Sequence, residues 1–256
     1  MCGIVGYVGN RQAVPILIEG LKKLEYRGYD SAGVAAHNGF CINITKAKGR
    51  LTVLEEKISN TDLRGTLGIG HTRWATHGKP SDINSHPHTN QSGEIAIVHN
   101  GIIENYRSLK DWLQKEGYHF VSETDTEIVA HLINYYYKGD LVAAVSSALD
   151  KIKGYYALAV IAKAHSDRVV VAKKDSPLVI GLGQGENFFS SDIPALLNTP
   201  EKFLRWKTAR SPLFGKTGSK SSTIRQFGQQ RSNGSDLGRG SRRKSRLPAL
   251  YAQRDP

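Results

Sequence analysis

The residue with the clearest chemical potential is Cys2, which directly follows the initiator Met1. Removal of Met1 would give Cys2 both a thiol and a free α-amino group. A chain-terminal amine titrates near pH ~8 and is therefore a usable general base at neutral pH, able to activate a nucleophile on the same residue. The alternative is a cysteine buried in a core strand, since free cysteine is among the most buried residue types. The remaining residues must decide between the two.

The sequence HTRWATHG, at residues 71–78, could bind a substrate for such a nucleophile. Arg73 can hold a carboxylate through two parallel hydrogen bonds. Trp74, Thr76 and His77 could line a pocket around it. The alternative is a surface loop in which Arg73 forms an ordinary ion pair.

The dipeptide Asn100-Gly101, in VHNGIIENY, follows an apolar run. The Asn100 side-chain amide and the Gly101 N–H could donate to an oxyanion. The loss of one such donor costs about 3–4 kcal/mol in acyl-transfer sites. The alternative is a simple hairpin turn, for which Asn-Gly is a strong signal.

Two further clusters carry charge. Asp125, in SETDTEIVAHLI, stands just ahead of a predicted helix. There Thr124 or Asp125 could cap the helix, or Asp125 could accept a hydrogen bond from a substrate ammonium. The sequence YRGYDSAG places Arg27, Tyr29 and Asp30 on a glycine-punctuated loop.

Metal and cofactor sites are not predicted. His86 and His88 are close in sequence, but no other Cys or His stands at a recognisable zinc spacing, so we expect them to be structural or solvated. The glycine-rich stretches near Gly183 and Gly215 lack the spacing of phosphate or dinucleotide loops.

The elements that must position these residues alternate between strands and helices. Strands are predicted at 4–8, 32–36, 41–45, 65–70, 94–98, 155–162, 168–174, 177–183 and 186–191, and helices at 13–24, 51–58, 106–116, 126–137, 141–152 and 193–198. Residues 71–88 are predicted to form a loop. Strands, then helices, then strands again favour a layered α/β or α+β domain over a doubly wound one.

Composition limits the class of protein. With 256 residues, 39% of them hydrophobic, the chain can form one large domain or two small ones. Its two cysteines, Cys2 and Cys41, imply no disulfide framework and fit a reducing cytosol. No run of about 18 apolar residues and no basic leader occurs, so we expect a cytoplasmic protein without a membrane segment.

The net charge of +12 is concentrated at the end of the chain. Of the 35 Lys and Arg, 14 lie after Pro200, against three of the 23 Asp and Glu, so this end carries +11 and the first 200 residues +1. Ser, Gly, Arg and Lys dominate residues 199–256, which predicts a basic, disordered tail. Such a tail would bind nucleic acid only non-specifically, since it has few aromatic residues for base stacking.

The tail also fits an out-of-frame origin. Back-translation of residues 206–218 in a shifted frame permits strand-like segments with Asn-Gly turns. A one-base slip near Asn198 is therefore a hypothesis, and sequencing of the coding DNA would test it.

The motifs CGIVGYVG, YRGYDSAG, HTRWATHG, HNGIIENY and SETDTE, in this order, closely resemble the class II glutamine amidotransferase domain. In particular they resemble the domain found in glutamine–fructose-6-phosphate aminotransferases. The resemblance runs from Cys2 to about Asn198. It implies a glutaminase domain over residues 1–198, with the N-terminal nucleophile fold, an α+β sandwich of four layers in the order α-β-β-α.

The resemblance also implies roles for single residues. Cys2 would attack the side-chain amide of L-glutamine and form a γ-glutamyl thioester, with no cofactor. Asn100 and Gly101 would hold the oxyanion, Arg73 the substrate carboxylate and Asp125 its ammonium. The residues that would shape the pocket are Trp74, Thr76 and His77, with Arg27 and Tyr29 on a loop beside it.

The family's sugar-phosphate isomerase domains, which use fructose 6-phosphate, lie outside this chain. Three readings stay open: the ammonia-producing part of such an aminotransferase, a folded but inactive truncated fragment, and the glutaminase domain of another class II amidotransferase. The sequence leaves open whether Met1 is removed and which oligomer forms.

Overall fold

The computed structural model describes residues 2–75 and 78–196, and beyond them the backbone of four short strands. These strands are β11 (Lys202–Arg205), β12 (Leu213–Gly215), β13 (Arg225–Gln226) and β14 (Leu250–Tyr251). The first two add to the main sheets, since β11 pairs with β9 and β12 pairs with β8. The other two pair with each other.

Two antiparallel sheets form the centre of the molecule. The first has the strand order β11-β9-β10-β1-β4-β2-β3, and the second has the order β12-β8-β7-β6-β5. The strands of the first sheet are β1 (Gly3–Val8), β2 (Ser31–His37), β3 (Ile42–Lys48), β4 (Leu67–Arg73), β9 (Val179–Gly183) and β10 (Glu186–Ser190). Those of the second are β5 (His88–Thr89), β6 (Ile95–Ile103), β7 (Gly154–Ala162) and β8 (His165–Lys174).

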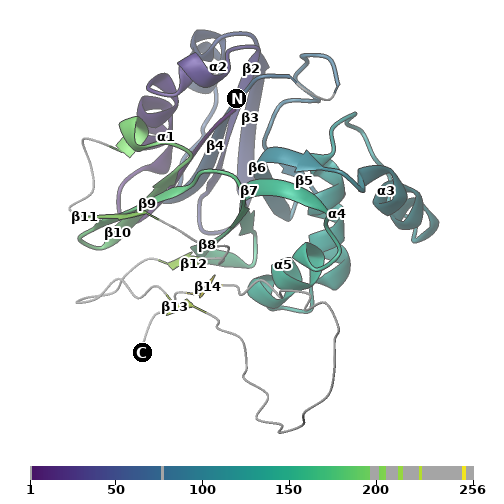
Figure 1. Ribbon diagram of the computed structural model, residues 1–256. Helices are drawn as coiled ribbons and strands as arrows, with labels where there is room; N and C mark the ends of the chain where they lie inside the picture. Colours follow the sequence, from purple (N-terminus) through teal and green to yellow (C-terminus); the bar gives the residue numbers. More distant parts are fainter. Residues whose placement is uncertain are drawn as a thin grey trace, which may run out of the picture.

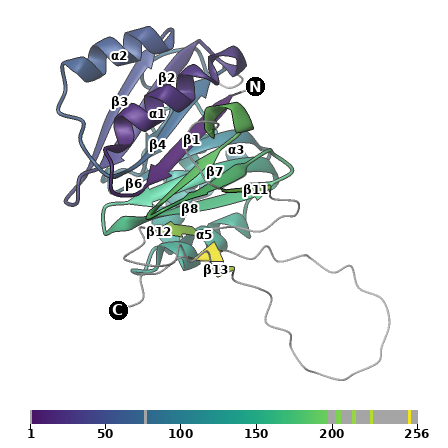
Figure 2. The same cartoon turned by 90° about the vertical axis from the view of Figure 1, so that its left-hand side faces the viewer.

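Helices cover the outer face of each sheet (Figure 1). The first sheet carries α1 (Ala13–Lys22) and α2 (Leu51–Ser59), which lie across it in Figure 2. The second carries α3 (Tyr106–Lys115), α4 (Thr126–Tyr136) and α5 (Leu141–Leu149). Two 3₁₀ turns, η1 (Glu25–Arg27) and η2 (Ile193–Leu196), flank the first sheet. The predicted four-layer α-β-β-α sandwich is confirmed.

Three apolar clusters hold the layers together. One fills the space between the sheets, with Ile4 and Val8 of β1 facing Ala96 and Val98 of β6. The other two lie between each sheet and its helices. Because the inner strands are covered on both faces, they are continuously apolar rather than alternating, and β1 is buried along its whole length.

The strands around the candidate site are longer than predicted. Pairing of β4 continues through Thr72 with β1 and through Arg73 with β2, so the first part of the expected 71–88 loop is strand. Asn100-Gly101 lies inside β6, where Gly101 pairs with Tyr156 of β7, and the hairpin-turn alternative is wrong. In both places the neighbouring strands extend the pairing, which the local sequence does not reveal. No helix within the described residues is long and apolar enough to cross a membrane.

Candidate active site

The candidate site is a cleft at the end of the sandwich where β1 begins and β4 ends. Side chains from both sheets and from the segment before α4 meet there. The residues that line the cleft are Cys2, Arg73, Trp74, His86, His99, Gly101, Thr124, Asp125 and Thr126. The fold therefore brings predicted residues from four separate motifs into one cleft.

The thiol of Cys2 lies against the backbone of Trp74. The Trp74 N–H donates to Sγ at 3.3 Å, and the thiol donates to the Trp74 carbonyl oxygen at 3.5 Å. Burial raises the pKa of the Cys2 thiol above its ordinary value. At neutral pH the thiol is therefore protonated, and attack by its sulfur requires a base that removes the proton.

Two donors hold the carbonyl group of Cys2. Arg27 Nε lies 3.2 Å from the carbonyl oxygen, and Asn100 Nδ2 lies 3.0 Å from it. Arg27 is itself almost fully buried, and its Nη1 forms an ion pair of 2.8 Å with Asp192. The backbone beside the thiol is thus fixed from two sides.

A cation and an anion line the same cleft. Arg73 and Asp125 are 4% and 5% exposed, so both charges are withdrawn from bulk water. Arg73 Nη2 donates to the Gly78 carbonyl oxygen at 3.1 Å. Asp125 Oδ2 accepts a hydrogen bond of 2.8 Å from the Ile103 N–H, and its side chain makes no capping bond to α4. The helix-cap alternative for Asp125 is therefore wrong.

The rim of the cleft is aromatic. Trp74 and Tyr29 are about half exposed, and their rings meet edge to face with centroids 5.5 Å apart. The Arg50 guanidinium stacks over the Tyr29 ring. The other two predicted pocket residues, Thr76 and His77, lie outside the described residues.

Four buried histidines support the cleft, and the sequence pattern does not predict that they gather there. His71, His86, His88 and His99 are all at most 5% exposed. His86 packs against His71 at 4.1 Å and against His88 at 4.8 Å between ring centroids. Of the two expected alternatives for His86 and His88, structural or solvated, the structure shows the first, because both rings are buried. Within the described residues, no group of three or more His, Cys, Asp or Glu could hold a metal ion.

Two acidic residues fix loops around the cleft. Asp192 binds Arg27, and Asp30 accepts a hydrogen bond from the Ala75 N–H. Asp30 stands in the quoted YRGYDSAG motif, but Asp192 lies 165 residues from Arg27, and no local pattern marks it. Only the fold reveals that partnership.

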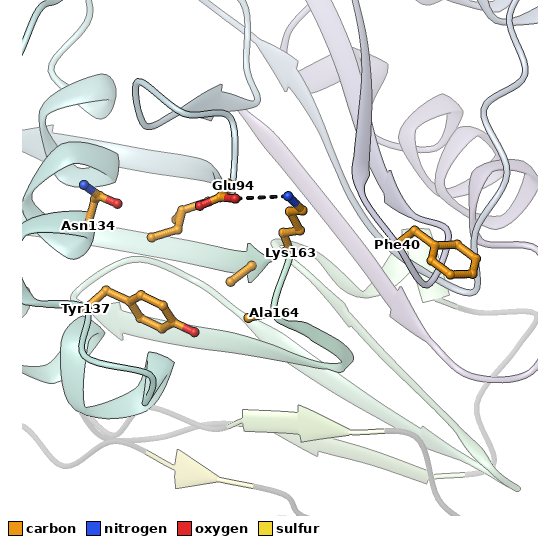
Figure 3. Close-up of a pocket in the computed structure, with 8 residues that line it drawn as sticks. Phe40, Glu94, Asn134, Tyr137, Lys163 and Ala164 are labelled. Atoms are coloured by element: carbon orange, nitrogen blue, oxygen red, sulfur yellow. Dashed lines mark hydrogen bonds and ion pairs between the residues drawn. The ribbon is translucent and has the colours of Figure 1, made fainter.

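A larger hollow of about 250 Å³ lies at the opposite end of the sandwich (Figure 3). Phe40, Tyr137 and Ala164 border it, and Glu94 pairs with Lys163 beside it at 3.1 Å. Its described lining contains no cysteine, serine or threonine, and its ion pair is half exposed. The smaller cleft is the candidate active site because nucleophile, donors and buried charges coincide there.

The chain matches the family model described as "Glutamine amidotransferase domain" over residues 71–198, which is half of its length. The chain belongs to this family. The chain is 65% identical over 198 residues to glutamine–fructose-6-phosphate aminotransferase (isomerizing) of Caldanaerobacter subterraneus, covering 77% of this chain and 32% of the relative. It is 58% identical over 220 residues to the Clostridium tetani protein of the same name, and the match covers 86% of this chain and 36% of that relative. The chain thus spans about a third of the length of these curated relatives.

Solved structures agree with the amidotransferase fold. The glutamine phosphoribosylpyrophosphate amidotransferase of B. subtilis superposes with a TM-score of 0.74 at 27% identity, covering 84% of this chain and 47% of that one. A structure described as the allosteric regulatory enzyme of purine biosynthesis gives 0.75 at 28% identity, with the same coverage.

Proposed function

We propose that this chain hydrolyses L-glutamine to L-glutamate and ammonia, with Cys2 as the nucleophile. The observation that supports this most strongly is the meeting of Cys2, Asn100, Arg73 and Asp125 around one cleft. An amino-acid substrate needs one cationic and one anionic anchor, and Arg73 and Asp125 provide this pair.

The reaction divides into two steps. With Met1 removed, the Cys2 α-amine takes the thiol proton, and Sγ attacks the side-chain amide carbon of glutamine. Asn100 and Gly101 hold the oxyanion that forms. The amine returns the proton to the leaving nitrogen, and ammonia departs from a γ-glutamyl thioester. Water then attacks the thioester carbon, which releases glutamate and restores the thiol.

The amine is suited to this proton transfer. Because burial raises the thiol pKa, the sulfur does not ionise unaided near neutral pH. A general base with a pKa close to the working pH is the most effective, and a free α-amine meets that condition. Trp74 and Tyr29 would close the pocket from the rim, with Thr76 and His77 contributing to its wall.

We further propose that the ammonia serves the amination of fructose 6-phosphate to glucosamine 6-phosphate. The high identity to two relatives named for that reaction supports this choice over another class II amidotransferase. Both cysteines are free, which fits a reducing cytosol.

Glutamate release from glutamine, measured without fructose 6-phosphate, tests the proposal. Intact mass first establishes that Met1 has been removed. The unaltered chain and Cys41→Ala should turn over glutamine, and Cys2→Ala should not. A glutamine-like electrophile should add once, on Cys2. Glutamate release by Cys2→Ala, an adduct on Cys41, or an inactive unaltered chain would refute it.

A further inference from the structure

The side-chain amide of Asn100 works only in one of its two orientations. Its nitrogen and oxygen ends have nearly the same shape, but one donates hydrogen bonds and the other accepts them. In the fold, Nδ2 lies 3.0 Å from the Cys2 carbonyl oxygen, and Oδ1 lies 3.0 Å from His71 Nε2. A flip of the amide would turn its oxygen toward the Cys2 carbonyl and the cleft, where an oxyanion would meet an acceptor.

The partner at the other end of the amide is a buried histidine. His71 is on β4 of the first sheet, fully buried, and Asn100 is on β6 of the second. His71 Nε2 lies 3.0 Å from Asn100 Oδ1 and 3.1 Å from the His99 carbonyl oxygen. A backbone carbonyl can only accept, so Nε2 carries the proton and donates. Since the Cys2 carbonyl also only accepts, both ends of the Asn100 amide are assigned independently.

The surroundings of His71 keep it in this form. Burial lowers the pKa of His71 to about 3, so the ring is neutral at working pH. Within the described residues Nδ1 has no hydrogen-bond partner, and the ring packs against His86. A neutral ring with its proton on Nε2 is therefore a steady donor to Asn100.

We propose that His71 is a positioning residue, whose Nε2–H holds the Asn100 amide with its N–H groups toward Cys2 and the oxyanion. This inference rests on the proposed glutaminase function and assigns a role to a residue outside the cleft lining. The effect belongs to kcat, because the oxyanion forms only after glutamine has bound.

Kinetics of three variants test the inference. His71→Phe keeps a ring and removes the donor, and His71→Gln places a neutral N–H near the position of Nε2. His37→Phe is the matched control, because His37 is equally buried but lies at the far end of β2, where it contacts Lys163 and Gly39. Loss of one oxyanion donor costs about 10²–10³ in kcat, so we expect His71→Phe to lower kcat about 10–100-fold, with the KM for glutamine changed less than about threefold.

The controls separate positioning from folding. His71→Gln should recover kcat to within about fivefold of the unaltered chain, and His37→Phe should change kcat per folded molecule by less than about twofold. In a double-mutant cycle, His71→Phe should cost nothing more once Asn100→Ala is present, since it acts through that amide. A raised KM at constant kcat, or fully additive losses in the cycle, would overturn the inference.

Nitrogen-15 NMR of the histidine rings needs no turnover. His71 should carry its proton on Nε2 and show no titration between about pH 5 and 8. A proton on Nδ1, or a titrating ring, would refute the hydrogen bond to Asn100 even in an inactive chain. An unaltered chain without glutamate release would refute the proposed function separately.

Discussion

At the scale of single residues, we propose that the cleft separates groups that bind substrate from groups that act during the reaction. Arg73 is a buried cation on the last residue of β4, and Asp125 is a buried anion just ahead of α4. Both would contact the bound amino acid equally before and during the reaction. Asn100, beside the Cys2 carbonyl, would matter mainly once the oxyanion exists.

Replacement of Arg73 should therefore act on KM. Hydrogen bonds to charged groups contribute about 1.5–3 kcal/mol, so Arg73→Ala should raise the KM for glutamine more than about tenfold, with a smaller change in kcat. Arg73→Lys keeps the charge but not the planar guanidinium, so its KM for glutamine should lie between those of Arg73→Ala and the unaltered chain. Asp125→Asn should resemble Arg73→Ala. Steady-state kinetics check this, and a fall in kcat alone would contradict the clamp.

At the scale of elements, strand β6 continues past Asn100 because the next residue, Gly101, is a glycine. Gly101 has a φ of +131°, a conformation that L side chains rarely adopt. A Cβ atom there would lie 2.1 Å from the Tyr155 carbonyl oxygen on β7. The pairing of β6 with β7 therefore requires glycine beside Asn100.

Gly101→Ala should destabilise the fold and reduce glutamate release. Gly93→Ala is the matched control, since Gly93 also has a positive φ, of +70°, but a Cβ there meets nothing within 4 Å. An unfavourable φ alone costs about 1–2 kcal/mol, and 1 kcal/mol shifts Tm by about 2–4 °C in a domain of this size. Gly101→Ala should lose clearly more than Gly93→Ala in thermal unfolding. An equal fall in Tm for the two variants would show that β7 can move away from the added Cβ without loss of stability.

At the scale of the whole molecule, buried histidines link stability to pH. Burial lowers the pKa of His71 to about 3 and holds the pKa values of His86 and His88 well below their ordinary range. In the unfolded chain these rings take up protons below about pH 6.5. Their contribution to stability is therefore complete above that pH and is lost as the pH falls toward the folded-state values.

The Tm should fall between about pH 7 and pH 5. Below about pH 6, one histidine that stays neutral in the fold lowers the free energy of unfolding by about 1.4 kcal/mol per pH unit, which is at least about 3 °C per unit, and the slope is smaller between about pH 6 and pH 7. His88→Gln should flatten the dependence, whereas His119→Gln, at an exposed site, should not. Thermal unfolding at constant ionic strength measures both slopes. A Tm independent of pH would contradict the assignment of neutral rings.

The division of the chain at about residue 198 is also a whole-molecule question. We propose that residues 199–256, with their charge of +11, add no stability to the folded unit, even where β11 and β12 pair with its sheets. Ordering a residue costs about 1–2 kcal/mol for the backbone alone, and this stretch has few large apolar side chains to offset it.

Trypsin should then remove this end rapidly while the first 198 residues survive. A chain shortened to Asn198 should keep its Tm and glutaminase activity and lose its affinity for polyanions at low salt. A chain ending at Gly215 retains β11 and β12, which pair with β9 and β8. If that chain is clearly more stable than the one ending at Asn198, these strands belong to the fold and the division is wrong.

The alternation of strands and helices in the sequence predicted a layered α/β or α+β domain, and the resemblance of its motifs to class II glutamine amidotransferases implied the four layers. The continuous apolar runs at β1 and β7 follow from burial on both faces, and short motifs singled out Cys2, Arg73, Asn100 and Asp125. These signals are local: a strand, a helix start or a glycine can be read within a few residues.

Tertiary structure alone decided the contacts that span the chain. Neighbouring strands extend β4 through Arg73 and carry β6 through Asn100, because pairing across a sheet depends on partners distant in sequence. The same holds for Asp192 with Arg27, and for His71 with Asn100. A buried polar group needs a partner at hydrogen-bond distance, and only the folded arrangement of both sheets determines which partner it meets.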